Sequence, residues 1–177
     1  MVRAIIDSNV LLVANGSHND ISDACREKCV ESLLEQKQNG ITVIDDCFLI
    51  LREYQNKTHP NQPKGVGDAF LKWLLQNKQN RKHVEQVSIT ELDINTYAEF
   101  PDKGLEPNFD APDRKFVAVS NAHPQKPKIL QAADCKWLDW WEQLADYNIS
   151  VDFLCPDDAC QFYKAKFPKK KPPRVPK

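Results

Sequence analysis

The sequence of 177 residues lacks any long apolar run, and this absence excludes the class of proteins that cross membranes by helices. A transmembrane helix needs about 20 consecutive apolar residues, and no segment approaches that length. The N-terminus also lacks the basic and small-residue regions of a signal peptide, because Asp7 interrupts the first apolar run at once. We therefore expect a cytoplasmic protein that does not contact membranes.

The sequence also lacks the cysteine and histidine spacings of a zinc site. Its six cysteines contain no CxxC pair, and none of its four histidines lies at zinc-ligand spacing from them. In a cytoplasmic protein we expect these cysteines to be mostly buried, reduced thiols. Internal repeats are absent as well, so repeat architectures are not expected.

Acidic residues are missing from one end of the chain. Residues 164–177 contain seven Lys or Arg and four prolines but no acid, which predicts a basic, Pro-rich, disordered tail. Residues 1–163 hold 17 basic and 25 acidic residues, a net charge of −8, and are long enough for one domain with a sizeable core. The tail is either a solvated end or an arm that attracts phosphates.

Short apolar runs alternate with amphipathic segments along the body of the chain. This alternation predicts an α/β fold with a mostly parallel sheet of four or five strands, flanked by helices. A capping-box pattern at Thr90 and Asp93 opens one of the expected helices. We expect strands at 2–6, 41–44, 84–89, 128–132 and 149–154, and helices at 21–39, 47–57, 68–79, 90–100, 113–122 and 136–147.

Two of the expected strands are followed by an aspartate, Asp7 after the first and Asp134 after the strand at 128–132. The carboxyl ends of parallel strands meet at one sheet edge and form its ligand crevice. Each acid alone is equally well explained as a helix cap, but two in equivalent positions favour a ligand site. Asp113 heads an expected helix and is a further candidate, although a helix cap also explains it. Glu53 interrupts an apolar helix surface and is another candidate, although a solvated helix position also explains it.

These four acids occur in the segments IIDSN, ILREY, DRKFVAVSNA and ILQAADCKWL. In this order and spacing the segments resemble the PIN-domain nucleases over about residues 2–155. The resemblance implies a PIN-like, three-layer fold and metal-dependent hydrolysis of phosphodiester bonds, most often in RNA, which leaves a 5′-phosphate and a 3′-hydroxyl. One or two Mg²⁺ or Mn²⁺ ions would be the cofactor, because crowded carboxylates repel one another unless a cation neutralises them.

The resemblance also assigns a role to each acid. Asp7 and Asp113 are expected to be the main ligands of the first metal, and Asp134 to bind metal directly or through water. Glu53 would orient a metal-bound water or complete a second site. In the stretch QAADC, the residues just before Asp134 lack the Thr or Ser with Asn that the family often has there, so one phosphate-binding group is missing.

Further residues near the acid motifs are expected to support the site. Asn9 would hold Asp7 or a loop backbone by hydrogen bonds, and Asp110, three residues before Asp113, is able to substitute for it. Basic residues close to the motifs are either scattered surface charges or contacts for a nucleic-acid backbone, and they are Lys57, Lys64, Arg114, Lys115 and Lys136.

The function expected from this pattern is a single-strand endoribonuclease with a role as a toxin, in defence or in RNA processing. Its nucleic-acid partner would be single-stranded RNA or single-stranded DNA. The sequence leaves open whether it also binds an antitoxin-like or other protein partner and whether it forms a homodimer. The alternative is a catalytically silent PIN-like module that binds RNA or a protein. A receiver-like phosphoryl-transfer domain would need a second acid beside Asp7, or an aspartate nucleophile with a suitably placed lysine, and IIDSNV shows neither.

Overall fold

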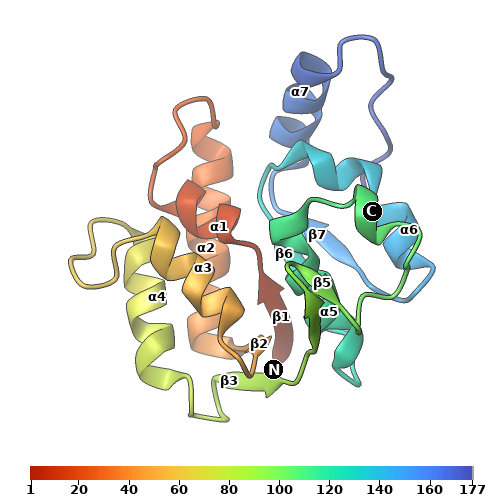
Figure 1. The fold of residues 1–177 in the computed structure, drawn as a ribbon. Coiled ribbons are helices and arrows are strands. Elements are labelled where there is room, and N and C mark those ends of the chain that lie inside the picture. The colour runs from red at the N-terminus through yellow and green to blue at the C-terminus, as the bar shows by residue number, and fades with distance from the viewer. Residues whose placement is uncertain (177) are drawn as a thin grey trace.

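The computed structural model describes residues 1–176 and contains the parallel sheet that the sequence predicts (Figure 1). The strand order is β3-β2-β1-β6-β7, and every neighbouring pair runs in parallel. The α/β fold class is therefore confirmed, with five strands in the sheet. These strands are β1 (Val2–Ile6), β2 (Gly40–Asp45), β3 (Val84–Val87), β6 (Lys128–Gln131) and β7 (Val151–Phe153).

In residues 1–176, seven α-helices pack on the sheet: α1 (Ser8–Ala14), α2 (Asp23–Asn39), α3 (Leu49–Lys57), α4 (Val66–Asn77), α5 (Arg114–Ala122), α6 (Trp141–Ala145) and α7 (Pro156–Lys166). In the central strand Ala4, Ile5 and Ile6 are all fully buried. Successive strand side chains point to opposite faces, so both faces of β1 are covered. None of the helices in residues 1–176 combines the length and apolar character that crossing a bilayer requires.

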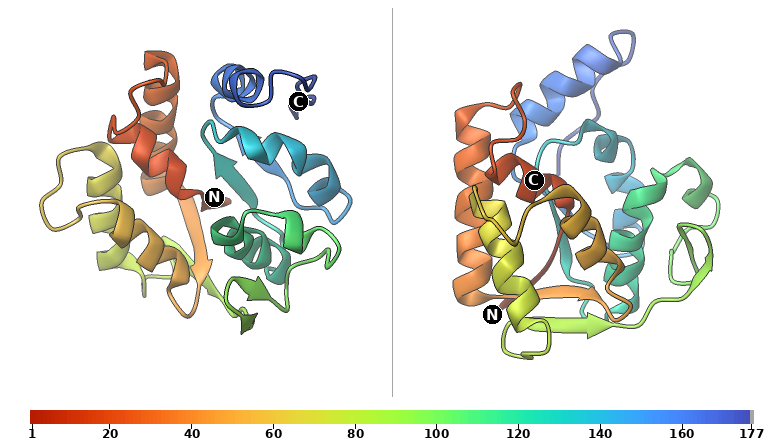
Figure 2. Two further views of the ribbon diagram at one scale, coloured as in Figure 1. Left: turned by 45° about the horizontal axis from the view of Figure 1, so that its top comes forward. Right: turned by 60° about the vertical axis from the view of Figure 1, so that its left-hand side comes forward.

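The helices gather in two groups on either side of β1. The left view of Figure 2 shows α1 to α4, from red to yellow, on one side and α5 to α7, from green to blue, on the other. The two groups meet where α3 contacts α5. Side chains from both halves of the chain therefore approach one another above the centre of the sheet.

Local sequence signals account for two of the helix starts. The Ser22 side chain accepts a hydrogen bond from the Cys25 backbone N–H and so caps α2. Asp45, at the end of β2, accepts hydrogen bonds from the backbone N–H groups of Leu49 and Ile50, at 2.7 and 2.9 Å, and so satisfies two N–H groups in the first turn of α3.

The expected helix at 90–100 is wrong, because this segment forms an antiparallel hairpin of β4 (Glu91–Asp93) and β5 (Thr96–Tyr97). Asn95 makes the turn with a φ of 54°, a left-handed conformation that Asn tolerates better than most residues. The turn lets Tyr97 become buried while Ile94 remains exposed. Tertiary burial of the tyrosine thus outweighs the local capping-box signal.

Two other predictions of helices need correction. The expected helix at 136–147 is divided into a 3₁₀ turn, η3 (Cys135–Asp139), and the short helix α6. Trp137, which belongs to η3, is fully buried in the core. Two helices, α1 and α7, were not expected. The segment of α1 reads as a continuous apolar run, which does not distinguish a buried helix from a strand.

The expected start of the basic tail at residue 164 falls inside α7, which continues to Lys166. Beyond it the chain returns over α6, where the Trp141 Nε1–H donates to the Arg174 carbonyl at 2.9 Å. Val175 packs against the core. Disorder of this segment stays a prediction, and Lys177 lies outside the described residues.

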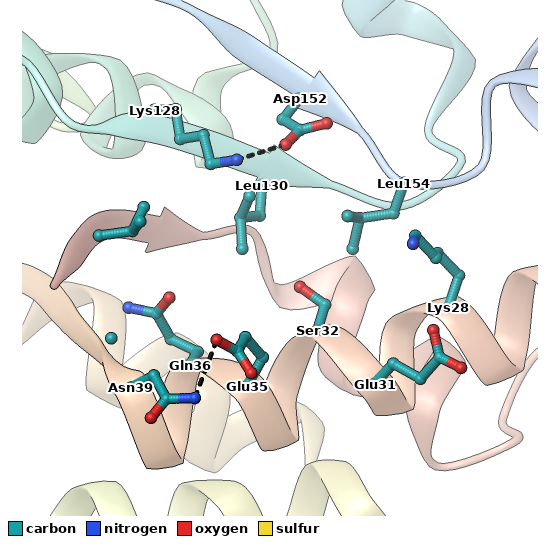
Figure 3. A pocket seen from close by; sticks show the side chains of 12 residues that line it. Lys28, Glu31, Ser32, Glu35, Gln36, Asn39, Lys128, Leu130, Asp152 and Leu154 are labelled. Carbon is teal, nitrogen blue, oxygen red and sulfur yellow. Dashed lines mark hydrogen bonds and ion pairs between the residues drawn. The ribbon is translucent and has the colours of Figure 1, made fainter.

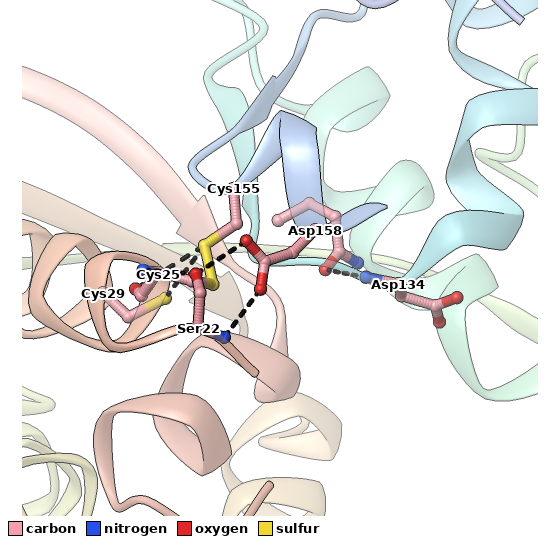
Figure 4. Close-up of a disulfide and its surroundings, with 7 residues drawn as sticks. Ser22, Cys25, Cys29, Asp134, Cys155 and Asp158 are labelled. Atoms are coloured by element: carbon pink, nitrogen blue, oxygen red, sulfur yellow. Dashed lines mark hydrogen bonds between the residues drawn. A yellow bond between two sulfur atoms is a disulfide. The ribbon is translucent and has the colours of Figure 1, made fainter. Parts of the chain in front are cut away.

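The expectation of reduced thiols is wrong for Cys25 and Cys155, which form a disulfide between α2 and the residue before α7 (Figure 4). The two cysteines are 130 residues apart, so only the fold brings them together. Cys29 lies beside the bridge, with its Sγ 4.0 Å from that of Cys155. Burial raises the pKa of Cys29 to about 12, so this sulfur remains a thiol.

The disulfide is reinforced by hydrogen bonds between the same two elements. The Asp158 carboxylate accepts hydrogen bonds from the Ser22 backbone N–H and from the Ser22 hydroxyl, both at 2.8 Å (Figure 4). The start of α2 is thus fastened to the first turn of α7, which carries the C-terminal basic segment.

Candidate functional site

The candidate site lies at the carboxyl ends of β1 and β6, where the order of the sheet reverses. The chain leaves β1 toward β2 on one side, whereas β6 pairs with β1 on the other. Such a switch point is where open parallel sheets bind ligands. Asp7 follows β1 directly, and its backbone N–H donates to the Leu130 carbonyl at 2.9 Å, which fixes it beside β6.

Asp7 is almost completely buried, and only one of its two carboxylate oxygens accepts a hydrogen bond from residues 1–176. Its Oδ1 accepts a hydrogen bond from the Asn9 backbone N–H at 2.8 Å, so it does cap α1. Its Oδ2 is buried and has no hydrogen-bond partner among residues 1–176. Burial, and then the charge of Asp113, raise the pKa of Asp7 well above its usual value. A carboxylate in this state requires a proton or a cation.

Three further aspartates, Asp110, Asp113 and Asp134, bring carboxylate oxygens within 4.8 Å of one another. Asp113 is the last residue of a 3₁₀ turn, η2 (Ala111–Asp113), and Asp134 caps η3 through the Lys136 N–H. Burial, followed by the charges of Asp134, Glu53 and Asp110, raises the pKa of Asp113 to about 7. The acids therefore repel one another strongly in the absence of a cation.

Glu53 reaches the site from α3 and is already neutralised by basic groups. Burial alone would raise its pKa, but the ion pair with Lys115 and hydrogen bonds from Ser8 and Lys57 hold the pKa of Glu53 below its usual value. The Ser8 hydroxyl donates to Glu53 Oε1 at 2.6 Å, and Lys57 Nζ lies 2.9 Å from the same oxygen. Glu53 is thus ionised but less available to a metal than Asp7.

The four predicted acids therefore converge from four separate elements, and their chemistry suits a hard divalent cation. Carboxylate oxygens are the ligands that Mg²⁺ and Mn²⁺ prefer. The unpaired Oδ2 of Asp7 and the raised pKa of Asp113 are what such a cation would relieve. Asp110, Asp113 and Asp134 form the group whose oxygens lie close enough together to share an ion, and the charges of Asp113 and Asp134 act on the neighbouring Asp7.

Most of the basic residues predicted to bind phosphate are engaged within the chain. Lys115 is buried on Glu53 and donates to the Pro112 carbonyl, and Lys136 pairs with Asp110. The Arg114 guanidinium donates to the carbonyls of Phe109 and Asn95. These three residues hold the acids and the hairpin in place.

The remaining two, Lys57 and Lys64, are more open. The Lys57 side chain is partly exposed beside Glu53, and Lys64 is exposed on the loop before α4. Lys57 therefore lies at the acid cluster and also faces solvent.

Three polar residues contribute in ways that the sequence did not reveal. It is the backbone of Asn9 that holds Asp7, while the Asn9 Oδ1 is buried without a partner among residues 1–176. Ser8 had no predicted role, although its place between Asp7 and Asn9 in the first motif was a signal. Gln131, buried at the end of β6, accepts a hydrogen bond from the Asp134 N–H at 3.3 Å.

The structure also contains a groove of about 470 Å³ between α2 and the β6–β7 half of the sheet (Figure 3). Leu130 and Leu154 form part of its wall, and a 2.6 Å ion pair joins Lys128 to Asp152. None of the predicted acids lines this groove. It is therefore separate from the candidate metal site.

Comparison of the chain with protein-family models, with curated proteins and with solved structures finds no match. The assignment of a function consequently depends on the geometry and electrostatics of the acid cluster.

Proposed function

We propose that this protein is a metal-dependent nuclease of the PIN type that hydrolyses phosphodiester bonds in single-stranded RNA. The buried, unpaired Oδ2 of Asp7, surrounded by the charges of Asp113, Glu53 and Asp134, is the observation that carries this proposal. A purely structural aspartate at a strand end would have both oxygens satisfied. An oxygen left unpaired at a sheet switch point favours a ligand.

The cofactor class is Mg²⁺ or Mn²⁺, held by Asp7, Asp113 and Asp134. When bound, such an ion lowers the pKa of a coordinated water and neutralises charge on a phosphate. Ser8, Lys57 and Lys115 keep Glu53 ionised, so that its carboxylate accepts a hydrogen bond from the attacking water and orients it. The partly exposed ammonium group of Lys57 is placed to attract the phosphate.

A second candidate function is a silent module that binds RNA or a protein without cleaving RNA. The observation that favours it is the pairing of Glu53 with Lys115 and of Asp110 with Lys136, because these ammonium groups already neutralise two of the acids. Direct titration with Mn²⁺ separates the two functions. Binding with a stoichiometry of one or two ions supports the nuclease, and no binding supports the silent module.

The proposal is tested by cleavage of a 5′-labelled, single-stranded RNA in Mg²⁺ or Mn²⁺. We expect Asp7→Asn and Asp113→Asn each to abolish cleavage while the circular dichroism spectrum stays unchanged, and a chelator to abolish wild-type cleavage. An exposed acid outside the site, Asp20→Asn, serves as the control. Cleavage at the wild-type rate by both site variants would show that the site is wrongly assigned.

A further inference from the structure

A second cavity, of about 340 Å³, opens directly beside the acid cluster. It shares Asp134 and Asn9 with the candidate metal site, and its opposite wall is formed by Phe162 and Lys166 of α7. His18, from the loop after α1, and Lys136 complete its rim. The cavity therefore extends the site toward α7, a helix that the sequence did not predict.

The chemistry of this cavity changes from one end to the other. Asp134 places one end at the acids that would hold a cation and the scissile phosphate. Phe162 packs partly on the core and leaves part of its ring at the cavity, which offers an apolar surface. Lys166 is exposed, and among residues 1–176 it forms no ion pair, so its charge is free for an anion.

The Asn9 side chain adds a hydrogen-bonding group at the inner wall. Its Oδ1 is buried and has no partner among residues 1–176, so it is an acceptor without a donor. Base amino groups and ribose hydroxyls are donors that single-stranded nucleic acids present. An aromatic surface, a lysine and an unpaired acceptor in one small cavity match the base, phosphate and sugar of one nucleotide.

We infer that this cavity binds the nucleotide next to the scissile phosphate, with its base on Phe162, its outer phosphate at Lys166 and a donor group at Asn9 Oδ1. This inference rests on the proposed binding of single-stranded RNA at the acid cluster. It makes α7 part of the substrate site. The disulfide between Cys25 and Cys155 holds this helix beside α2 and so positions the cavity wall.

The test is equilibrium binding of a short single-stranded RNA that carries 2-aminopurine, whose fluorescence is quenched when it stacks on an aromatic ring. Ca²⁺ replaces Mg²⁺, because it neutralises carboxylates without adopting the strict octahedral geometry of Mg²⁺. We expect quenching with the wild type, its loss together with about a tenfold weaker affinity in Phe162→Leu, and its recovery in Phe162→Tyr.

Lys166→Gln gives an independent arm, because this exposed side chain is not needed for folding. We expect it to raise the KM for RNA cleavage about tenfold with little change in kcat. Lys164→Gln is the matched control: it removes one charge from the same helix, does not line the cavity, and should leave KM and quenching unchanged.

The outcomes separate this inference from the nuclease proposal. Cleavage by the wild type with unchanged quenching in Phe162→Leu and unchanged KM in Lys166→Gln would overturn the cavity assignment and leave the nuclease intact. Quenching that depends on Phe162, in a protein that neither cleaves RNA nor binds Mn²⁺, would support the cavity and refute the nuclease. Absence of quenching in the wild type would also overturn the inference.

Discussion

At the scale of single residues, burial of the Asp113 carboxylate and, after it, repulsion from the neighbouring acids oppose folding. The pKa of Asp113 is raised from 3.8 to about 7, which corresponds to about 4 kcal/mol at most. The raised pKa means that the folded state holds its proton more tightly than the unfolded state. The stability that protonation of Asp113 contributes is therefore complete below pH 4, decreases as the pH rises toward 7, and is absent above pH 7.

We accordingly expect the melting temperature of the metal-free protein to fall between pH 4 and pH 7. Asp113→Asn should flatten this decrease and make the metal-free protein more stable than the wild type at pH 8. Thermal melts across this pH range measure the effect, with Asp20→Asn, an exposed acid, as the control. An equal pH dependence in wild type and Asp113→Asn would show that this carboxylate does not carry the repulsion.

Glu53 behaves differently, because its partners make it a charged but compensated group. Replacing it by Gln leaves Lys115 buried without an ion-pair partner, which costs about 3 kcal/mol. We expect Glu53→Gln to lower stability by that amount, and Glu53→Gln combined with Lys115→Met to recover most of it in urea unfolding.

The same two acids are expected to differ in metal binding. Glu53→Gln should weaken Mn²⁺ binding less than Asp7→Asn in calorimetric titration, because Glu53 is already paired with lysines whereas the Asp7 Oδ2 has no hydrogen-bond partner among the described residues. Equal losses of affinity would reject separate roles for them.

At the scale of elements, the disulfide fastens α2 to α7 across a separation of 130 residues. In the chain-entropy model, a loop of this length contributes about 5 kcal/mol by restricting the unfolded state. We expect a reductant to lower the free energy of unfolding of the wild type by an amount of this order. Cys160→Ser, which changes a free cysteine, is the control and should respond to the reductant as the wild type does.

At the scale of the whole molecule, the distribution of charge separates an acidic body from a basic C-terminal segment. Residues 168–177 carry five of the positive charges and no acid, and they follow the end of α7. Removing these residues leaves Lys166 and the cavity wall in place. The deletion therefore tests long-range attraction separately from the cavity.

We expect this deletion to weaken RNA binding and to flatten its dependence on salt, because fewer phosphates are then neutralised by the protein. The slope should change by about 0.7 for each phosphate that the segment neutralises in the full-length protein. Turnover at saturating RNA should change little, because the acid cluster is untouched.

Binding isotherms at several salt concentrations measure the slope. An unchanged slope would show that the segment docks on α6, as the hydrogen bond between Trp141 and Arg174 already indicates for part of it.

The sequence by itself determined the fold class and indicated the four acids of the candidate site. Hydrophobic periodicity and the turns between apolar runs are local signals, so the strands of the parallel sheet were predictable from neighbouring residues. The acids at strand ends were predictable for the same reason, since a polar residue that follows an apolar run marks the point where a strand ends. The hairpin at 91–97 escaped this reasoning because burial of Tyr97 outweighed the local capping signal.

Only the tertiary structure decided which groups satisfy one another. The ion pair of Glu53 with Lys115, the disulfide between Cys25 and Cys155 and the cavity beside α7 all join residues far apart in the chain. Such pairs leave no periodic trace in a single sequence, because their distances depend on how helices pack over the sheet. The unpaired oxygen of Asp7 is of the same kind: its lack of a partner results from the positions of all the elements around it.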